Sequence, residues 1–128
     1  MEEELIALLV ANAAVSARLS QRVYFGRKPQ AEAATHYAVL NVISLDRSYD
    51  MQGNTGHAAA RVQIDVYAPA YKDAKVTARV IDAVLSGHSG GVFQGVFLMA
   101  QRDLTEMDAG DVNPLFRISS DYMIHYTE

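Results

Sequence analysis

Residues 61–87 read RVQIDVYAPAYKDAKVTARVIDAVLSG and carry the strongest structural pattern in the chain. Apolar and polar side chains alternate through residues 61–67, which is typical of a strand with one buried face. Pro69 interrupts that pattern, and residues 71–85 continue with the spacing of an amphipathic helix that Gly87 ends. The stretch therefore predicts a strand, a turn and a packed helix. It contains no pairing of nucleophile, base or metal ligands.

Length and composition limit the class of protein. The chain has 128 residues, half of them hydrophobic and 20% charged, which predicts one globular domain spanning residues 1–128. The net charge of −4 and dispersed lysines and arginines disfavour a general nucleic-acid-binding role, because phosphates need a basic face. With no cysteine, a disulfide framework, a thiolate metal site and a cysteine nucleophile are impossible. The acidic start and the short apolar run at residues 5–10 predict a soluble, cytosolically made protein.

Other segments complete the predicted fold. An amphipathic helix is expected at the N-terminus, with Leu5, Leu8, Leu9 and Val15 on its buried side. The order α-β-β-β-α-β-β predicts an α+β fold, a mainly antiparallel β-sheet with two helices packed on it. The helices are expected at residues 2–19 and 71–85, and the strands at 22–25, 37–45, 61–68, 96–104 and 115–126.

Three connections between these elements are expected to be irregular. They are residues 26–34, the glycine-rich 87–95 and the acidic 105–114. The strand at residues 37–45 is apolar on both faces, which predicts a central strand.

The most unusual connection is residues 46–56, which contain several turn-forming residues. We expect it to be too long for a two-residue turn and to project as an arm or loop. Tyr49 and Met51 within it are hard to assign to a core, so they suggest a partner surface. The alternative, in which the segment folds back on its own domain, is equally compatible with the sequence.

One catalytic motif matches. Gly87-His88-Ser89-Gly90-Gly91 satisfies G-x-S-x-G, which in α/β-hydrolases lies between a strand and a following helix. Here a helix comes before the motif and a strand after it, so we interpret Gly87 as a helix cap and predict no catalytic residues.

No metal or cofactor site is predicted either. The four histidines, His36, His57, His88 and His125, have no i,i+4 or H-x-H partner, although the fold can still bring them together in space. The acidic residues 106–111 lack the alternating ligands and closing glutamate of a calcium loop.

Several short segments together match a known pattern. They are Arg22-Val23-Tyr24, Arg27, Pro29-Gln30, the strand 61–68, Ala74 and Leu85, Arg102-Asp103-Leu104, and the segment 116–122. In this order they resemble the small tail-completion, or tail-terminator, proteins of tailed bacteriophages and phage-like particles. The resemblance spans nearly the whole chain and is strongest at residues 61–68. It departs from the expected pattern at Thr35-His36-Tyr37, where a proline is usual, and in the long loop at residues 105–114.

The resemblance implies a structural role in the virion at the junction of tail and head. Its members form a homo-oligomeric ring, commonly a hexamer, that caps the tail tube, contacts a head-completion or connector protein and lets DNA pass. It implies no enzyme activity, cofactor, membrane or sequence-specific nucleic-acid contact. On this interpretation, we expect subunit or tail-tube contacts from Arg47, Tyr49, Met51, Gln52 and Asn54.

A second interpretation remains open on the residues alone. A small α+β domain with helices on an antiparallel sheet can enclose a pocket for a ligand or a reaction. Such a domain is expected to be a monomer with a deep pocket, whereas a ring-forming protein is expected to run well above its 14.0 kDa monomer mass.

Overall fold

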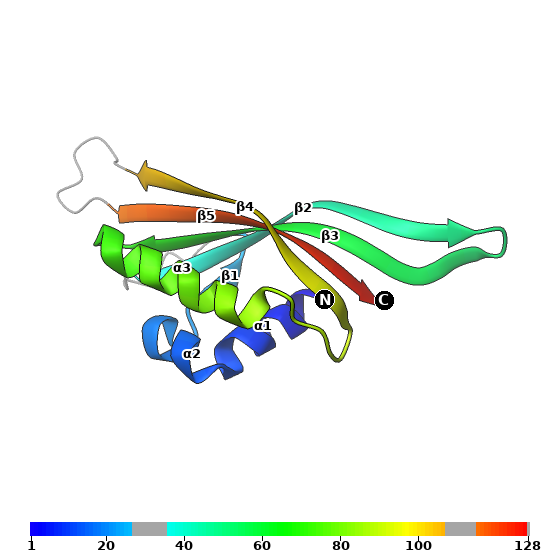
Figure 1. Ribbon diagram of the computed structural model, residues 1–128, viewed down its shortest axis with the longest axis horizontal. Helices are drawn as coiled ribbons and strands as arrows, with labels where there is room; N and C mark the ends of the chain where they lie inside the picture. The colour runs from blue at the N-terminus through cyan, green and yellow to red at the C-terminus, as the bar shows by residue number, and fades with distance from the viewer. Residues whose placement is uncertain (27–35, 107–114, 128) are drawn as a thin grey trace.

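The molecule is built on one five-stranded sheet (Figure 1). The computed structural model describes residues 1–26, 36–106 and 115–127. The strand order is β1-β2-β3-β5-β4, and each neighbouring pair is antiparallel except β1–β2, which is parallel. The α+β fold with a mainly antiparallel sheet is therefore confirmed, although the sheet is mixed. The strands are β1 (Val23–Phe25), β2 (Tyr37–Asp50), β3 (Gly53–Ala68), β4 (Phe93–Glu106) and β5 (Leu115–Thr127).

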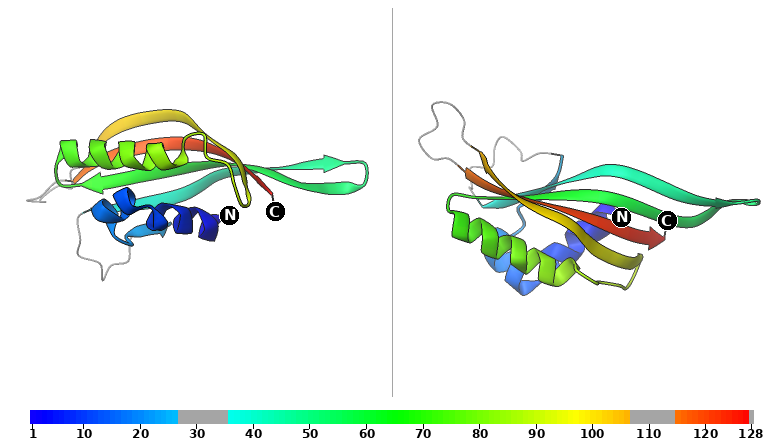
Figure 2. Two further views of the ribbon diagram at one scale, coloured as in Figure 1. Left: turned by 60° about the horizontal axis from the view of Figure 1, so that its bottom comes forward. Right: turned by 45° about the horizontal axis from the view of Figure 1, so that its top comes forward.

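Three helices lie on one face of the sheet (Figures 1 and 2). They are α1 (Glu2–Ala11), α2 (Ala13–Leu19) and α3 (Tyr71–Leu85). Alternate side chains of β3 point toward them, as the period-2 pattern predicts, and are fully or almost fully buried. A single hydrophobic core results, which joins these β3 residues to the apolar sides of all three helices and to β5.

The predicted single helix at residues 2–19 is wrong in one respect, because Asn12 divides it. Asn12 has an extended backbone, with φ −78° and ψ 126°. Its side-chain oxygen accepts hydrogen bonds from the backbone N–H groups of Ala14 (3.0 Å) and Val15 (3.2 Å). An asparagine that satisfies the free N–H groups of a new helix start competes with continuation of the preceding helix. The apolar positions still face the core, with Leu5, Leu9, Val15 and Leu19 fully buried.

Helix α3 has the predicted bounds. Its buried side comprises Ala74, Thr77, Ala78, Ile81 and Leu85. After the cap at Ser86, Gly87 adopts φ +75°, which glycine accepts without the strain of a Cβ, and its N–H donates to the Val96 carbonyl at 2.8 Å.

The β2–β3 connection corrects a prediction. Both strands continue well beyond residues 45 and 61, and only Met51 and Gln52 form the turn between them. The expectation that residues 46–56 are too long for a two-residue turn is therefore wrong. Positive φ angles at Gly53 (+117°) and Gly56 (+83°) let the strand pass through residues that on sequence alone indicate a loop.

Two further predictions need correction. Strand β2 is internal only beside β1, whose register ends at Leu40, and beyond it Val42, Ile43 and Leu45 are exposed rather than covered on both faces. Strand β4 begins at Phe93, inside the connection predicted at residues 87–95. The loops predicted at 26–34 and 105–114 lie largely outside the described residues.

Candidate functional site

The most distinctive feature of the surface is the end of the β2–β3 hairpin, residues 46–56, which we call the arm. Strand β3 pairs with β5 only from His57 onward, and the pairing of β2 with β1 ends at Leu40. The tip of the hairpin is therefore a two-stranded ribbon, and all views show it extending away from the helices and the rest of the sheet (Figures 1 and 2). The prediction that this segment projects is correct, and it does not fold back on its own domain.

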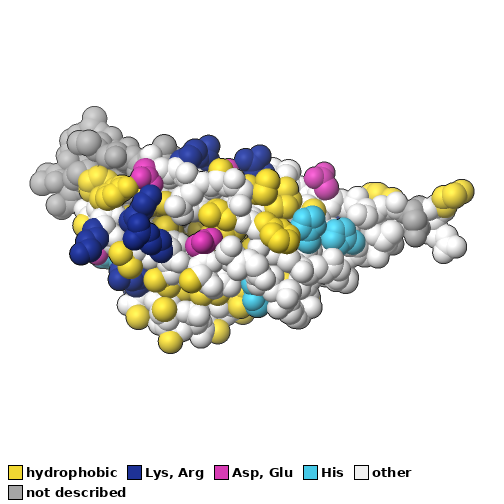
Figure 3. Space-filling view, viewed as in Figure 1, with side chains coloured by type: hydrophobic (Ala, Val, Ile, Leu, Met, Phe, Trp, Pro, Cys, Tyr) yellow, Lys and Arg dark blue, Asp and Glu magenta, His cyan; other side chains and the backbone are white. Residues whose placement is uncertain are grey.

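The predicted contact residues all lie on the arm. Tyr49 is 68% exposed and Met51, in the turn, is fully exposed. Arg47 and Gln52 are exposed as well, and the backbone of Asn54 pairs with Tyr49 across the ribbon. The arm thus presents apolar side chains at its far end to solvent (Figure 3).

The arm is held as a ribbon by its own contacts. The Thr55 hydroxyl donates to the Ser48 carbonyl oxygen at 3.1 Å, across the two strands. Strand pairing continues outward to Asp50 and Gly53, with a bulge between Arg47 and Tyr49. Because a two-stranded hairpin alone in water is marginally stable, a partner that covers it would add stability.

Two histidines meet at the base of the arm. His125 Nδ1 lies 3.4 Å from His57 Nε2, and the rings are stacked with centroids 5.5 Å apart. The rings of Phe97 and His125 meet at a steep angle, with centroids 6.0 Å apart. Sequence spacing cannot find this pair, since it depends on the register of β3 with β5. Within the described part of the chain, no group of three or more metal-ligating side chains exists.

Sequence reasoning missed a second apolar surface, on β4. Phe97, Leu98 and Met99 are 51%, 38% and 60% exposed, and they follow one another on the outermost strand of the sheet. We call these three residues the β4 patch. The unbroken apolar run of residues 96–100 is the signal for this surface in the sequence, but by itself it predicts only a strand.

The face of the sheet away from the helices carries paired charges. Asp121, on β5, is buried and lies 2.9 Å from Arg61 on β3 and 3.6 Å from Arg102 on β4. Gln63 donates to both carboxylate oxygens of Asp65 at 3.1 Å. The contacts of Asp121 tie β5 to both neighbouring strands, whereas the contact between Gln63 and Asp65 lies within β3. Each buried acid therefore has a partner on an otherwise open face.

Strand β4 is also tied to α3. Tyr71 and Lys75 donate to the Asp103 carboxylate at 2.6 and 2.8 Å. The bond from Lys75 is the main reason that the pKa of Asp103 lies below its usual value, and the same bond raises the pKa of Lys75.

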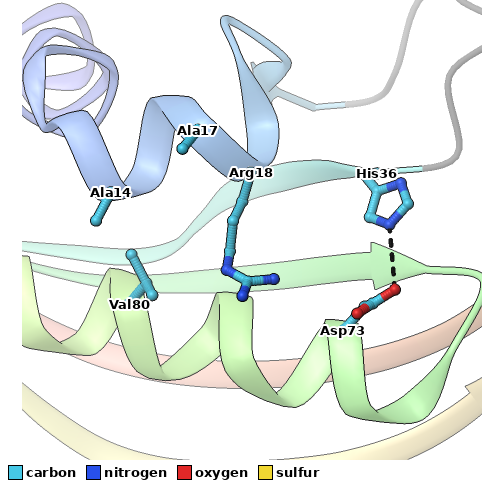
Figure 4. Close-up of a pocket in the computed structure, with 6 residues that line it drawn as sticks. All are labelled: Ala14, Ala17, Arg18, His36, Asp73 and Val80. Carbon is cyan, nitrogen blue, oxygen red and sulfur yellow. Dashed lines mark ion pairs between the residues drawn. The ribbon is translucent and has the colours of Figure 1, made fainter.

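The surface grooves are open. One of about 660 Å³ lies between α2 and α3, where Arg18 points from α2 toward α3 over small side chains (Figure 4). At its end, His36 Nε2 lies 3.6 Å from Asp73 Oδ2.

Ser89 belongs to the G-x-S-x-G match. It is exposed in the connection that leads from α3 to β4. This helix-to-strand order is the reverse of the strand-to-helix context that activates such a serine.

Along the described residues, no helix is both long and apolar enough to span a bilayer.

Exposed apolar surfaces and open strand edges such as these are typical of sites at which proteins bind other proteins. The family comparison agrees. The chain belongs to the family described as tail completion protein gp17, whose model matches residues 3–127. It is therefore a structural protein of a phage-type tail.

Solved structures share the fold. A chain from the virion of a native gene transfer agent (GTA) particle has a TM-score of 0.74 at 19% identity, covering 97% of this chain and 92% of that chain. A second solved chain has a TM-score of 0.50 at 22% identity, covering 100% of this chain and 99% of the other. A comparison with curated proteins gives no sequence match.

Proposed function

We propose that this protein forms a homo-oligomeric ring, a hexamer, that closes the end of the tail tube. In this role it lies at the junction of tail and head, contacts the tail tube protein on one side and a head-completion or connector protein on the other, and leaves a passage for DNA. Its chemistry is assembly rather than catalysis.

The observation that carries the proposal is the arm. Tyr49 and Met51 are large and exposed, and neither side chain belongs to the hydrophobic core. Tyrosine and methionine are enriched where proteins bind proteins, because they bring large apolar area at modest desolvation cost. Family membership supplies the context of a tail.

The test uses the purified full chain, alone and with assembled tail tubes. Sizing with light scattering is expected to give a species near six times the 14.0 kDa monomer mass, either free or on the tube ends. Tubes mixed with the protein are expected to stop growing at a fixed length. A protein that stays monomeric under both conditions and leaves tube growth unchanged would contradict the proposal.

A matched pair of variants assigns the effect to the arm. Tyr49→Ser with Met51→Ser is expected to abolish capping, whereas Lys72→Ser, on the exposed side of α3, is expected to leave it intact. Equal capping by both variants would show that the arm side chains are not needed for capping.

A further inference from the structure

Exposed large apolar side chains are concentrated at two places. Nine such residues occur in the described parts of the chain, and eight of them lie on the β2 side of the hairpin and its turn or in the β4 patch. The ninth, Tyr71, donates to Asp103 and packs its ring against Phe116. Three exposed apolar residues in a row on an outer strand promote aggregation unless another surface covers them.

Both places are also open strand edges. Strand β4 ends the sheet, so its side away from β5 has no strand beside it in the described structure. Strand β2 likewise has no described neighbour on its outer side after Leu40, where the register with β1 ends. Each edge therefore offers backbone N–H and C=O groups that another strand can pair.

Strand direction makes the two edges compatible between copies. Three successive antiparallel pairings, β2–β3, β3–β5 and β5–β4, make β4 run opposite to β2. A ring of six relates neighbours by a 60° rotation, which cannot reverse the direction of a strand. The outer edge of β2 in one copy therefore meets β4 of the next copy antiparallel, like most pairs within the sheet.

We propose that the outer edge of the arm pairs with the neighbouring copy's β4, so that one sheet continues from subunit to subunit. This rests on the proposed ring. Opposite charge is expected to set the register, because Asp46 and Arg102 are both exposed and both belong to the face without helices. With Asp46 opposite Arg102, counting along antiparallel strands sets Tyr49 opposite Met99, where β2 and β4 each have a bulge, between Arg47 and Tyr49 and between Leu98 and Ala100.

The register can be tested directly because the chain has no cysteine. Residues opposite each other on antiparallel strands have Cα atoms about 4.5–5.5 Å apart, within the range that a disulfide bridges. A chain with both Tyr49→Cys and Met99→Cys is expected to give, on oxidation, a ladder of linked multimers on a non-reducing gel. Each single variant can form at most a dimer.

The control is a chain with Tyr49→Cys and Lys72→Cys. It keeps the cysteine on the arm and places the second cysteine on the exposed side of α3. Both double variants are first checked by sizing, with tail tubes present, because each shortens a side chain expected in the contact. If only these variants fail to assemble, the Asp46 measurement below decides the register. If they assemble but the ladder from 49 and 99 is no stronger than the control, the edge pairing is overturned and the ring stands. If neither the variants nor the unmodified chain assembles, the ring proposal fails and this inference with it.

A second measurement does not depend on a disulfide. Asp46→Arg is expected to weaken assembly, since it sets two cations against each other, and raising the salt concentration is expected to reduce that loss. Assembly of Asp46→Arg equal to that of the unmodified chain at low salt would overturn the register.

Discussion

Strand β3 has two halves with opposite properties. From Ala58 to Tyr67 it is paired on both sides, and its alternate side chains are buried in the single core. From Gly53 to Gly56 its strand pairing in the described structure is with β2 alone, and no other described element covers the ribbon (Figure 1). One continuous strand therefore holds the domain together at one end and leaves a surface for assembly at the other. The contrast implies that stability and assembly can be changed separately.

The largest effect on stability is expected from the paired half. Ile64 is 1% exposed and lies between Leu40 and Ser120 in the register. Ile64→Ala leaves a cavity there, so it should lower the free energy of unfolding by about 2–5 kcal/mol. Urea unfolding followed by circular dichroism measures this. A loss no larger than that of an exposed-arm substitution would contradict the division of β3 into two halves.

The next effect comes from the link between the sheet and α3. The Tyr122 hydroxyl donates to Asp82 at 3.0 Å, and burial is the main reason that the pKa of this phenol is raised, so the donor stays protonated across the working pH range. Tyr122→Phe keeps the ring and removes the bond, which should cost about 1–2 kcal/mol. Tyr49→Phe, on the exposed arm, makes the same chemical change outside the core and should cost less free energy of unfolding in the same urea assay.

Breaking the helix cap should have a similar or smaller effect. Asn12→Ala removes the acceptor for two N–H groups at the start of α2, at a cost of about 0.5–2 kcal/mol. Asn12→Ser, which retains an acceptor, should recover most of the loss in the same urea unfolding assay. Equal stability of the alanine and serine variants would mean that the cap is not what divides α1 from α2.

Acid should weaken the contacts of Asp103 that join β4 to α3. The pKa of Asp103 is lowered in the folded protein, so its contribution is present above the usual aspartate value and is lost as the pH falls through the lowered one. The unmodified chain should therefore lose more stability than Asp103→Asn between about pH 5 and about pH 2. Because the carboxylate is exposed, the difference should be small and should shrink in high salt. Parallel pH curves for the two proteins would contradict this role.

Some of these structural features can be predicted from the sequence and others cannot. Helix α3 and the buried half of β3 follow from periodicity, because local spacing determines which side chains meet the core. The arm residues Tyr49 and Met51 were found as large apolar side chains in a polar connection. The split at Asn12 was missed because flanking alanines favour a continuous helix.

Other features depend on strand register and topology. The His57–His125 pair exists only because β3 and β5 align as they do. The β4 patch is a candidate surface because β4 ends the sheet, whereas an apolar strand in the middle of the sheet would be covered by its own domain. Long-range pairing of this kind leaves no local pattern in one sequence.

The smallest effect on stability and the largest on assembly should come from the arm. Tyr49→Ser combined with Met51→Ser removes two exposed side chains that are not part of the core. The free energy of unfolding should therefore change by no more than about 0.5 kcal/mol. Assembly should nevertheless fall sharply, because the same side chains are the ones expected to bury against the next copy's β4 patch. Met99→Ser should reproduce that loss from the other side of the contact. If the arm variant were instead as destabilised as Ile64→Ala, the arm would belong to the folding half of the molecule, and its exposure would have to be explained without a partner.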